Sequence, residues 1–184
     1  MANSNPHLTL VLGGARSGKS RYAEATVMAT PAPWIYVATA EPFDDEMKAR
    51  IAEHRGRRGG QWQTVEAPLD LAGAIAGAPP AATLLVDCLT LWLSNALLLD
   101  FDEAQPNAPV SRWDEERSAL LRWLADYRGT ALLVSNEVGS GIVPASALAR
   151  RFQDEQGRLN QQLAASCEAV TLVVAGIAVP IKAH

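Results

Sequence analysis

Short apolar segments recur along the chain and alternate with longer segments in which apolar and polar positions are mixed. The short segments are rich in Leu, Val, Ile and Ala, which is typical of strands buried in a parallel sheet. They predict strands at residues 8–12, 34–38, 83–87, 130–135, 170–174 and 179–181. Residues 61–66 alternate between apolar and polar positions, which predicts a strand that is buried on one face.

The mixed segments predict helices at residues 19–28, 44–57, 89–99, 111–127 and 145–166, with a short helix that opens at Pro68. We expect Asp44 to cap one of these helices. Ser111 is expected to cap another, with Glu115 near the capping-box spacing. Residues 100–109 are acidic and contain proline, which indicates a surface loop.

Strands that alternate with helices predict an α/β fold, with a mainly parallel sheet and helices on both faces. The last two predicted strands are too close for a crossover helix, so we expect them to form an antiparallel hairpin at one edge. The length suits a single domain over residues 1–184, with residues 1–7 and 183–184 as flexible tails. Ligands of such sheets bind where the strands end. The residues expected at these ends are Gly13, Thr39, Asp87 and Asn136.

Composition and charge narrow the class of protein. The chain is 48% hydrophobic and 20% charged, with a net charge of −4, so it lacks the broad positive field that nucleic acid binding requires. We see no signal peptide and no apolar stretch long enough for a membrane span, and we expect a cytoplasmic protein. The two cysteines, Cys88 and Cys167, have no spacing typical of zinc sites. We expect both to be buried, reduced thiols.

A phosphate-binding motif follows the first predicted strand. Gly13, Gly18, Lys19 and Ser20 match the pattern G-x-x-x-x-G-K-[ST], between a strand and a helix as the pattern requires. Glycines let backbone N–H groups turn toward phosphate oxygens, and the following helix presents its N-terminus to the same anion. The residues predicted to form this phosphate cradle are Gly13, Gly14, Ala15, Arg16, Ser17, Gly18, Lys19 and Ser20.

A metal ion is expected beside the cradle. The hydroxyl of Ser20 can reach Mg²⁺, and the apolar strand 83–87 ends in Asp87, whose carboxylate can complete the metal shell. Many strands end in aspartate for turn or cap reasons, and that alternative role for Asp87 stays open. Lys19 would contribute its charge at the β- and γ-phosphates.

His54 is the only histidine on a predicted element, because His7 and His184 lie in the expected tails. It shares an apolar stripe with Met47 and Ile51, so a part-buried histidine that bonds a backbone carbonyl is one reading. Catalysis is the other reading, since a neutral imidazole near an electrophilic phosphorus is a competent nucleophile. The arginines that follow it could hold triphosphate oxygens, and these are Arg55, Arg57 and Arg58.

The ordered set of motifs resembles the bifunctional adenosylcobinamide kinase and adenosylcobinamide-phosphate guanylyltransferase family of cobalamin biosynthesis. The match covers essentially the whole chain after the first few residues. It rests on GGARSGKS at 13–20, YVATA at 36–40, DDEM at 44–47, RIAEHR at 50–55, WQTVE at 62–66, SNEVGSGIVP at 135–144, GRLNQ at 157–161 and VVAGI at 173–177.

The resemblance implies a two-step enzyme with a RecA-like P-loop core. It would phosphorylate adenosylcobinamide and then transfer GMP from GTP to that phosphate, through a histidine that corresponds to His54. The resemblance leaves open whether ATP, GTP or both serve the kinase step, and it implies a homo-oligomer such as a trimer. It adds nucleotide contacts at Thr39, Ala40, Glu41, Arg55, Gly56, Arg57, Arg58, Glu66 and Asp87.

Three other readings of the motif stay in view. A small-molecule P-loop kinase would have no use for His54 as a nucleophile. A regulatory GTPase usually carries Asn-Lys-x-Asp, which does not occur here. A RecA-like assembly protein is disfavoured by the acidic balance. Residues 136–144 follow a central strand and are rich in glycine, so we expect them to line the acceptor side of the site; the alternative is a plain connection to the next helix.

Overall fold

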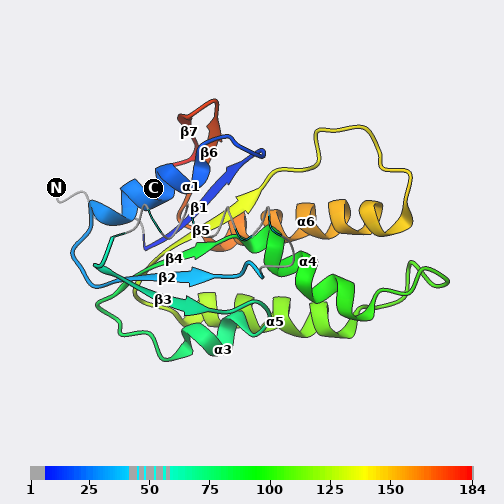
Figure 1. Cartoon of the computed structure of the whole chain (residues 1–184), viewed down its shortest axis with the longest axis horizontal. Coiled ribbons are helices and arrows are strands. Elements are labelled where there is room, and N and C mark those ends of the chain that lie inside the picture. The colour runs from blue at the N-terminus through cyan, green and yellow to red at the C-terminus, as the bar shows by residue number, and fades with distance from the viewer. Residues whose placement is uncertain are drawn as a thin grey trace.

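The computed structural model describes residues 7–41, 45, 48, 52, 56 and 59–183. In this part of the chain, one seven-stranded sheet has the order β3-β2-β4-β5-β1-β6-β7 (Figure 1). All neighbouring strands are parallel except β6 and β7, which form the expected antiparallel hairpin at the edge. The strands are β1 (Leu8–Gly13), β2 (Trp34–Ala38), β3 (Trp62–Glu66), β4 (Thr83–Asp87), β5 (Thr130–Asn136), β6 (Ala169–Val174) and β7 (Ile177–Lys182).

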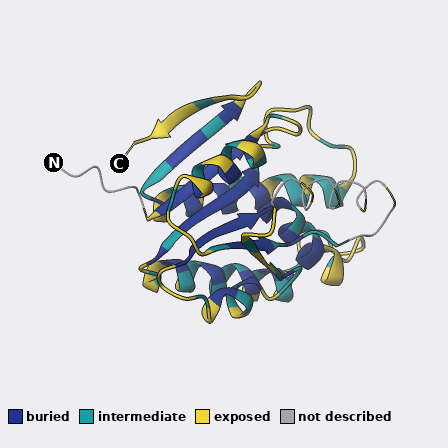
Figure 2. Ribbon diagram, turned by 60° about the vertical axis from the view of Figure 1, so that its left-hand side comes forward, coloured by how far each residue is buried: buried dark blue, intermediate teal, exposed yellow. Residues whose placement is uncertain are grey.

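Helices cover both faces of this sheet, as predicted. Helix α1 packs on one face against a cluster that includes Val11, Leu85 and Val134. The other helices share the opposite core, which contains the fully buried Trp92 and Trp113. Figure 2 shows the central strands buried between these two layers. The helices are α1 (Lys19–Met28), α3 (Leu71–Ala76), α4 (Leu89–Asp100), α5 (Ser111–Asp126) and α6 (Ala147–Ser166).

One predicted helix start and one predicted helix cap are wrong. The short helix begins at Leu71 instead of Pro68, and its cap is Asp70, whose carboxylate accepts from Gly73 N at 2.8 Å. Ser111 is the first helical residue of α5 and caps nothing, so the capping box with Glu115 does not form. Its place is taken by Asp100 at the end of α4, which accepts from Arg112 N at 3.1 Å. A carboxylate brought in by folding therefore satisfies this helix end.

Other predictions concern the start of α6, the two cysteines, the helix at residues 44–57 and membrane spans. Helix α6 begins two residues later than predicted, because Ser146 is its cap and accepts from Ala149 N at 3.1 Å. Cys88 and Cys167 are buried and unbridged, as expected. The expected helix at residues 44–57, with its cap Asp44, lies mostly outside the described residues. The four residues of this range that are described, 45, 48, 52 and 56, are helical. Within the described residues, no helix combines the length and apolarity that crossing a membrane requires.

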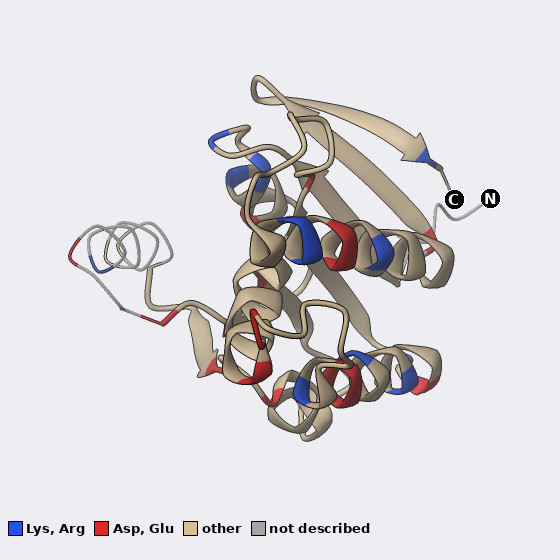
Figure 3. Ribbon diagram, turned by 90° about the vertical axis from the view of Figure 1, so that its right-hand side faces the viewer, with Lys and Arg blue, Asp and Glu red and all other residues tan. Residues whose placement is uncertain are grey.

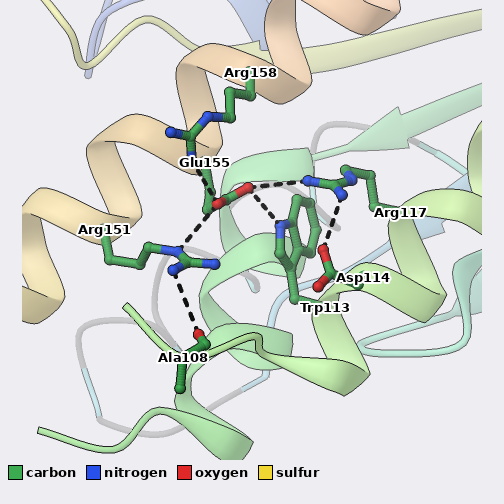
Figure 4. A network of polar contacts seen from close by, with 7 residues as sticks. All are labelled: Ala108, Trp113, Asp114, Arg117, Arg151, Glu155 and Arg158. Carbon is green, nitrogen blue, oxygen red and sulfur yellow. Dashed lines mark hydrogen bonds and ion pairs between the residues drawn. The ribbon is translucent and has the colours of Figure 1, made fainter. Parts of the chain in front are cut away.

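A buried carboxylate joins α5 to α6. Glu155 is only 3% exposed and accepts from Trp113 Nε1 at 3.0 Å and from Arg117 Nη1 at 3.1 Å (Figure 4). Arg158 donates to its other oxygen at 2.8 Å, and Arg151 is ion-paired with the same oxygen at 3.1 Å. Trp113 also packs edge-on against Trp92 of α4, so one side chain of α6 is linked to three helices.

Candidate functional site

The carboxyl ends of the parallel strands bring the predicted residues to one side of the sheet. Gly13 at the end of β1 pairs in register with Asn136 at the end of β5. Asp87 at the end of β4 pairs with Ala38 of β2, which pairs in turn with Glu66 of β3. Figure 3 views the molecule from the side toward which these strands point. From β1 the chain crosses toward β2, and from β5 it crosses the other way to β6, so the cradle lies at a topological switch point.

The loop after β1 has the geometry of a phosphate cradle. Gly18 has φ of 94°, a left-handed conformation that favours glycine, and it is the N-cap of α1. A Cβ at Gly13 would lie 2.6 Å from the carbonyl oxygen of Val173, so a larger residue cannot replace this glycine. The turn is closed by Ser17 N, which donates to Gly14 O at 3.2 Å.

Lys19 is the first residue of α1 and is 9% exposed. Its ammonium folds back over the loop and donates to Gly14 O at 3.2 Å. The first turn of α1 contains no acidic residue, so nothing there offsets the positive end of the helix dipole. Ala15 and Arg16 are exposed, and Ser20 is half-buried. A buried ammonium at an open helix N-terminus is suited to an anion with several charges.

Asp87 lies across β5 from the cradle and is 8% exposed. Tyr36 of β2 donates its hydroxyl to Asp87 Oδ2 at 3.1 Å, which fixes the carboxylate. Burial raises the pKa of the neighbouring Cys88 thiol; the Asp87 carboxylate raises it further, whereas the Lys19 ammonium acts in the opposite direction. The same buried thiol is thus influenced by both the Lys19 ammonium and the Asp87 carboxylate.

The donor set fits Mg²⁺ bound together with a nucleotide. No group of three or more His, Cys, Asp or Glu side chains able to hold a metal occurs among the described residues. A hydroxyl from Ser20 and a carboxylate from Asp87 are the oxygen ligands that Mg²⁺ accepts, while phosphates and waters usually supply the rest. Ser20 and Asp87 are therefore the kinds of ligand that the protein would contribute to a magnesium ion.

Thr39 is fully buried, and its hydroxyl is used within the protein. It donates to Cys88 O at 2.7 Å and accepts from Cys88 N at 2.8 Å, so it holds the backbone directly after Asp87. Asn95 of α4 donates to Thr39 O at 2.9 Å and to Pro68 O at 3.0 Å. The predicted nucleotide contact of Thr39 stays a prediction. In the structure, its hydroxyl holds the backbone at the carboxyl end of β4.

Two supporting residues were not predicted from the sequence, Tyr36 and Asn95. Tyr36 is a buried residue of β2, where a tyrosine is readily explained by the packing of its ring alone. Asn95 had a usable signal, because it is the single amide within the strongly apolar helix α4. A buried amide in such a helix needs hydrogen-bond partners, and here the partners are the carbonyls of two loops.

The remaining predicted residues are distributed as follows. Ala40 and Glu41 directly follow Thr39 and are half-buried, and Glu66 is exposed on the edge strand β3. Gly56 is helical and exposed. His54, Arg55, Arg57 and Arg58 lie outside the described residues. A cavity of about 280 Å³ lies elsewhere, between α4 and α6, and contains none of the predicted site residues; Leu97, Leu98 and Phe152 are part of its lining.

The fold and the cradle together define a P-loop nucleotide-binding protein of the RecA-like class. A protein of Pyrococcus horikoshii OT3 superposes with a TM-score of 0.52 at 8% identity, over 96% of this chain and 86% of its own. An ATPase of a type III secretion system superposes with a TM-score of 0.56 at 11% identity, over 95% of this chain and 56% of its own. At these identities the similarity shows the fold alone.

The sequence comparison is more specific. The chain belongs to the cobinamide kinase / cobinamide phosphate guanyltransferase family, whose model matches residues 9–181. The bifunctional adenosylcobalamin biosynthesis protein CobP of Pseudomonas aeruginosa is 49% identical over 94% of this chain and 96% of its own length. Its counterpart CobU of Escherichia coli K12 is 44% identical over 95% and 99%. The predicted class, a kinase and nucleotidyltransferase of cobalamin biosynthesis, is thereby confirmed, and the three alternatives are set aside.

Proposed function

We propose that the protein phosphorylates adenosylcobinamide and then transfers GMP from GTP to adenosylcobinamide phosphate through a guanylyl intermediate on His54. The products are adenosylcobinamide-GDP and pyrophosphate. The observation that carries the proposal is the closed cradle, with the buried Lys19 ammonium over its loop and the Asp87 carboxylate across β5. This arrangement suits phosphoryl and nucleotidyl transfer, in which charge on phosphate oxygens must be neutralised.

The chain's own residues have separate tasks in this scheme. Backbone N–H groups of residues 13–20 bind the phosphates, and Lys19 adds a full charge at the β- and γ-positions. Ser20 and Asp87 would hold Mg²⁺, which neutralises charge on the phosphate oxygens when bound. Tyr36 keeps the Asp87 carboxylate oriented by its hydrogen bond. Either ATP or GTP serves the first step, and GTP serves the second.

His54 supplies the nucleophile of the second reaction. The lone pair of its neutral imidazole attacks the α-phosphorus of GTP, a P–N bond forms, and the bond to the pyrophosphate leaving group breaks. A phosphate oxygen of adenosylcobinamide phosphate then attacks the same phosphorus and releases the imidazole. Arg55, Arg57 and Arg58 follow His54 in the sequence and would neutralise the leaving pyrophosphate. We further propose a cytoplasmic homo-oligomer, with a trimer as the state implied by the family resemblance.

Parallel labelling with two forms of GTP tests the intermediate. In the presence of Mg²⁺, α-³²P-GTP should leave label on the protein and γ-³²P-GTP should not. The adduct should be acid-labile and base-stable, as a P–N bond is. His54→Ala should lose the label but keep kinase activity, since phosphoryl transfer requires positioning and metal, not this nucleophile. His7→Ala, which removes another of the three histidines, is the matched control and should label normally.

Lys19→Ala separates failure of the cradle from failure of the nucleophile. This variant should fold normally yet bind GTP too weakly to become labelled, because the charge at the phosphates is gone. Label from α-³²P-GTP that persists in His54→Ala, or that maps to another residue, would show that the assignment of His54 is wrong. Unchanged GTP affinity in a folded Lys19→Ala protein would remove the cradle from the site.

A further inference from the structure

Asn136 ends β5, the strand that lies between the cradle strand β1 and the Asp87 strand β4. It pairs in register with Gly13, and Asp87 pairs with Val134, two residues earlier on the same strand. Position 136 therefore lies between the end of the cradle strand and the Asp87 strand, two residues farther along β5 than the partner of Asp87. Asn136 therefore belongs to the row of strand ends at which an α/β sheet of this kind binds its ligand.

The backbone of Asn136 is fixed by side chains of two helices, α4 and α6. Its N–H donates to Thr90 Oγ1 of α4 at 2.8 Å, and its carbonyl accepts from Asn160 Nδ2 of α6 at 3.0 Å. Asn160 is held in turn, because its Oδ1 accepts from Ser135 Oγ at 2.7 Å and from Gln156 Nε2 at 3.1 Å. Two helices thus place this residue without using its side-chain amide.

The side-chain carbonyl of Asn136 takes no part in this hydrogen-bond network. Its Oδ1 atom is buried and has no hydrogen-bond partner among the residues that the structure describes. A buried acceptor without a partner costs about 1–3 kcal/mol, and native proteins hold few of them. The residue as a whole is half-buried and adjoins Glu137, which is exposed. Rotation about its last side-chain bond is soft, so the oxygen can turn toward a bound group.

We propose that Asn136 Oδ1 accepts a hydrogen bond from the attacking hydroxyl of the cobinamide substrate and orients it toward the γ-phosphorus. The inference rests on the proposed kinase step. The hydroxyl oxygen forms the new bond to the γ-phosphorus while the bond to the β–γ bridging oxygen breaks. The hydroxyl proton passes to an oxygen of the transferred phosphoryl group. The amide accepts a hydrogen bond without taking the proton, and it acts through position alone.

Three variants measured in both reactions test this role. Asn136→Leu has similar size but cannot accept a hydrogen bond, so kcat of cobinamide phosphorylation should fall by about 10²-fold. Labelling of the protein by α-³²P-GTP involves no acceptor hydroxyl, so the loss of labelling should be at least about tenfold smaller than the loss of kcat. Asn136→Asp keeps an acceptor oxygen and should retain about tenfold more kinase activity than Asn136→Leu, with a raised KM for the nucleotide because a negative charge is added.

Gln156→Leu is the matched control for structure. It removes hydrogen bonds of the supporting network but leaves the amide of residue 136 in place. If this variant disturbs the site through its structure, cobinamide phosphorylation and protein labelling should fall by similar factors. Asn136→Leu should instead lower phosphorylation much more than labelling. Kinase activity of Asn136→Leu within about threefold of wild type, or an equal loss in both reactions, would overturn the inference. If the wild-type protein does not phosphorylate cobinamide, the proposed kinase function itself is wrong.

Discussion

The hydroxyl of Thr39 donates to and accepts from the backbone of Cys88, the residue directly after Asp87. These two hydrogen bonds are buried, and Asn95 holds the carbonyl of the same threonine. Thr39 and Asn95 therefore position the turn that carries the predicted metal ligand. Such a residue contributes to the site by holding its backbone, whatever ligand is bound.

Thr39→Val tests this role, because valine has nearly the same shape and lacks the hydroxyl. Both the N–H and the carbonyl of Cys88 lose their partner, so the free energy of unfolding should fall by about 1–3 kcal/mol. Urea unfolding of the two proteins gives the difference. Thr64→Val on the exposed side of β3 is the matched control and should change stability by less than about 0.5 kcal/mol. Equal effects at the two positions would contradict the assignment.

At the residue scale, the sequence predicted the groups that carry charge better than the groups that hold them. The cradle follows from a motif whose spacing is set by phosphate chemistry, and Asp87 from an apolar strand that ends in a carboxylate, as the structure has it. Tyr36 and Asn95 act through partners that are 51 and 56 residues away in the sequence. Such pairs depend on strand order and helix packing, which local patterns do not encode.

At the scale of elements, Glu155 holds α5 and α6 together through a buried carboxylate with charged and neutral donors (Figure 4). Arg117 bridges it to Asp114, and its guanidinium also lies 5.7 Å from the Trp113 ring centre. The carboxylate is buried, whereas the arginine side chains around it are 18–57% exposed, so removal of the carboxylate leaves guanidinium groups that water can still reach.

Glu155→Ala should lower the free energy of unfolding by about 1–3 kcal/mol, because the buried Trp113 indole N–H loses its acceptor while the arginines stay in reach of water. Thermal or urea unfolding measures the change. The control is Glu115→Ala on the exposed face of α5, for which a change below about 0.5 kcal/mol is expected. A loss at Glu155 that is no larger than at Glu115 would show that the network does not join the helices.

Element boundaries show where local patterns stop being informative. The strands and the long helices were predicted within one or two residues, because burial on one or both faces imposes a clear period. The cap of α5 was not predicted, because the group that satisfies its first turn is Asp100 of α4. A residue can look like a cap in the sequence and still leave that task to a neighbour supplied by folding.

At the scale of the whole molecule, the buried thiol of Cys167 links folding to pH. Burial raises its pKa from 9.0 to about 12, although the Lys182 ammonium acts in the opposite direction. The folded state therefore keeps the thiol protonated where the unfolded chain ionises it. This contribution to stability is complete below pH 9.0 and is lost as the pH rises toward about 12.

The wild type should thus lose on the order of 1 kcal/mol of stability to this group between pH 8 and pH 10. Urea unfolding at several pH values measures the slope. Other groups also ionise in this range, so the relevant quantity is the difference in slope from Cys167→Ala, in which the thiol is absent. Identical slopes for the two proteins would mean that Cys167 is not linked to folding.

The alternation of strands and helices predicted an α/β sheet with an edge hairpin, and both are present. The sequence did not predict that β5 would separate the cradle strand from the Asp87 strand. That order depends on which helices share a core, and the opposite core unites α3, α4, α5 and α6. The inserted strand is also what places Asn136 between Gly13 of β1 and the Asp87 strand β4.

The cradle is completed by residues that are synthesised much later than the cradle itself. Gly176 N, in the turn between β6 and β7, donates to Ser17 O at 2.8 Å, and Val173 O borders Gly13. At about 5–20 residues per second, these segments leave the ribosome on the order of ten seconds apart. A nascent chain therefore carries the full phosphate-binding motif in an unfinished loop. Nucleotide therefore meets the completed cradle only after β6 and β7 have been made.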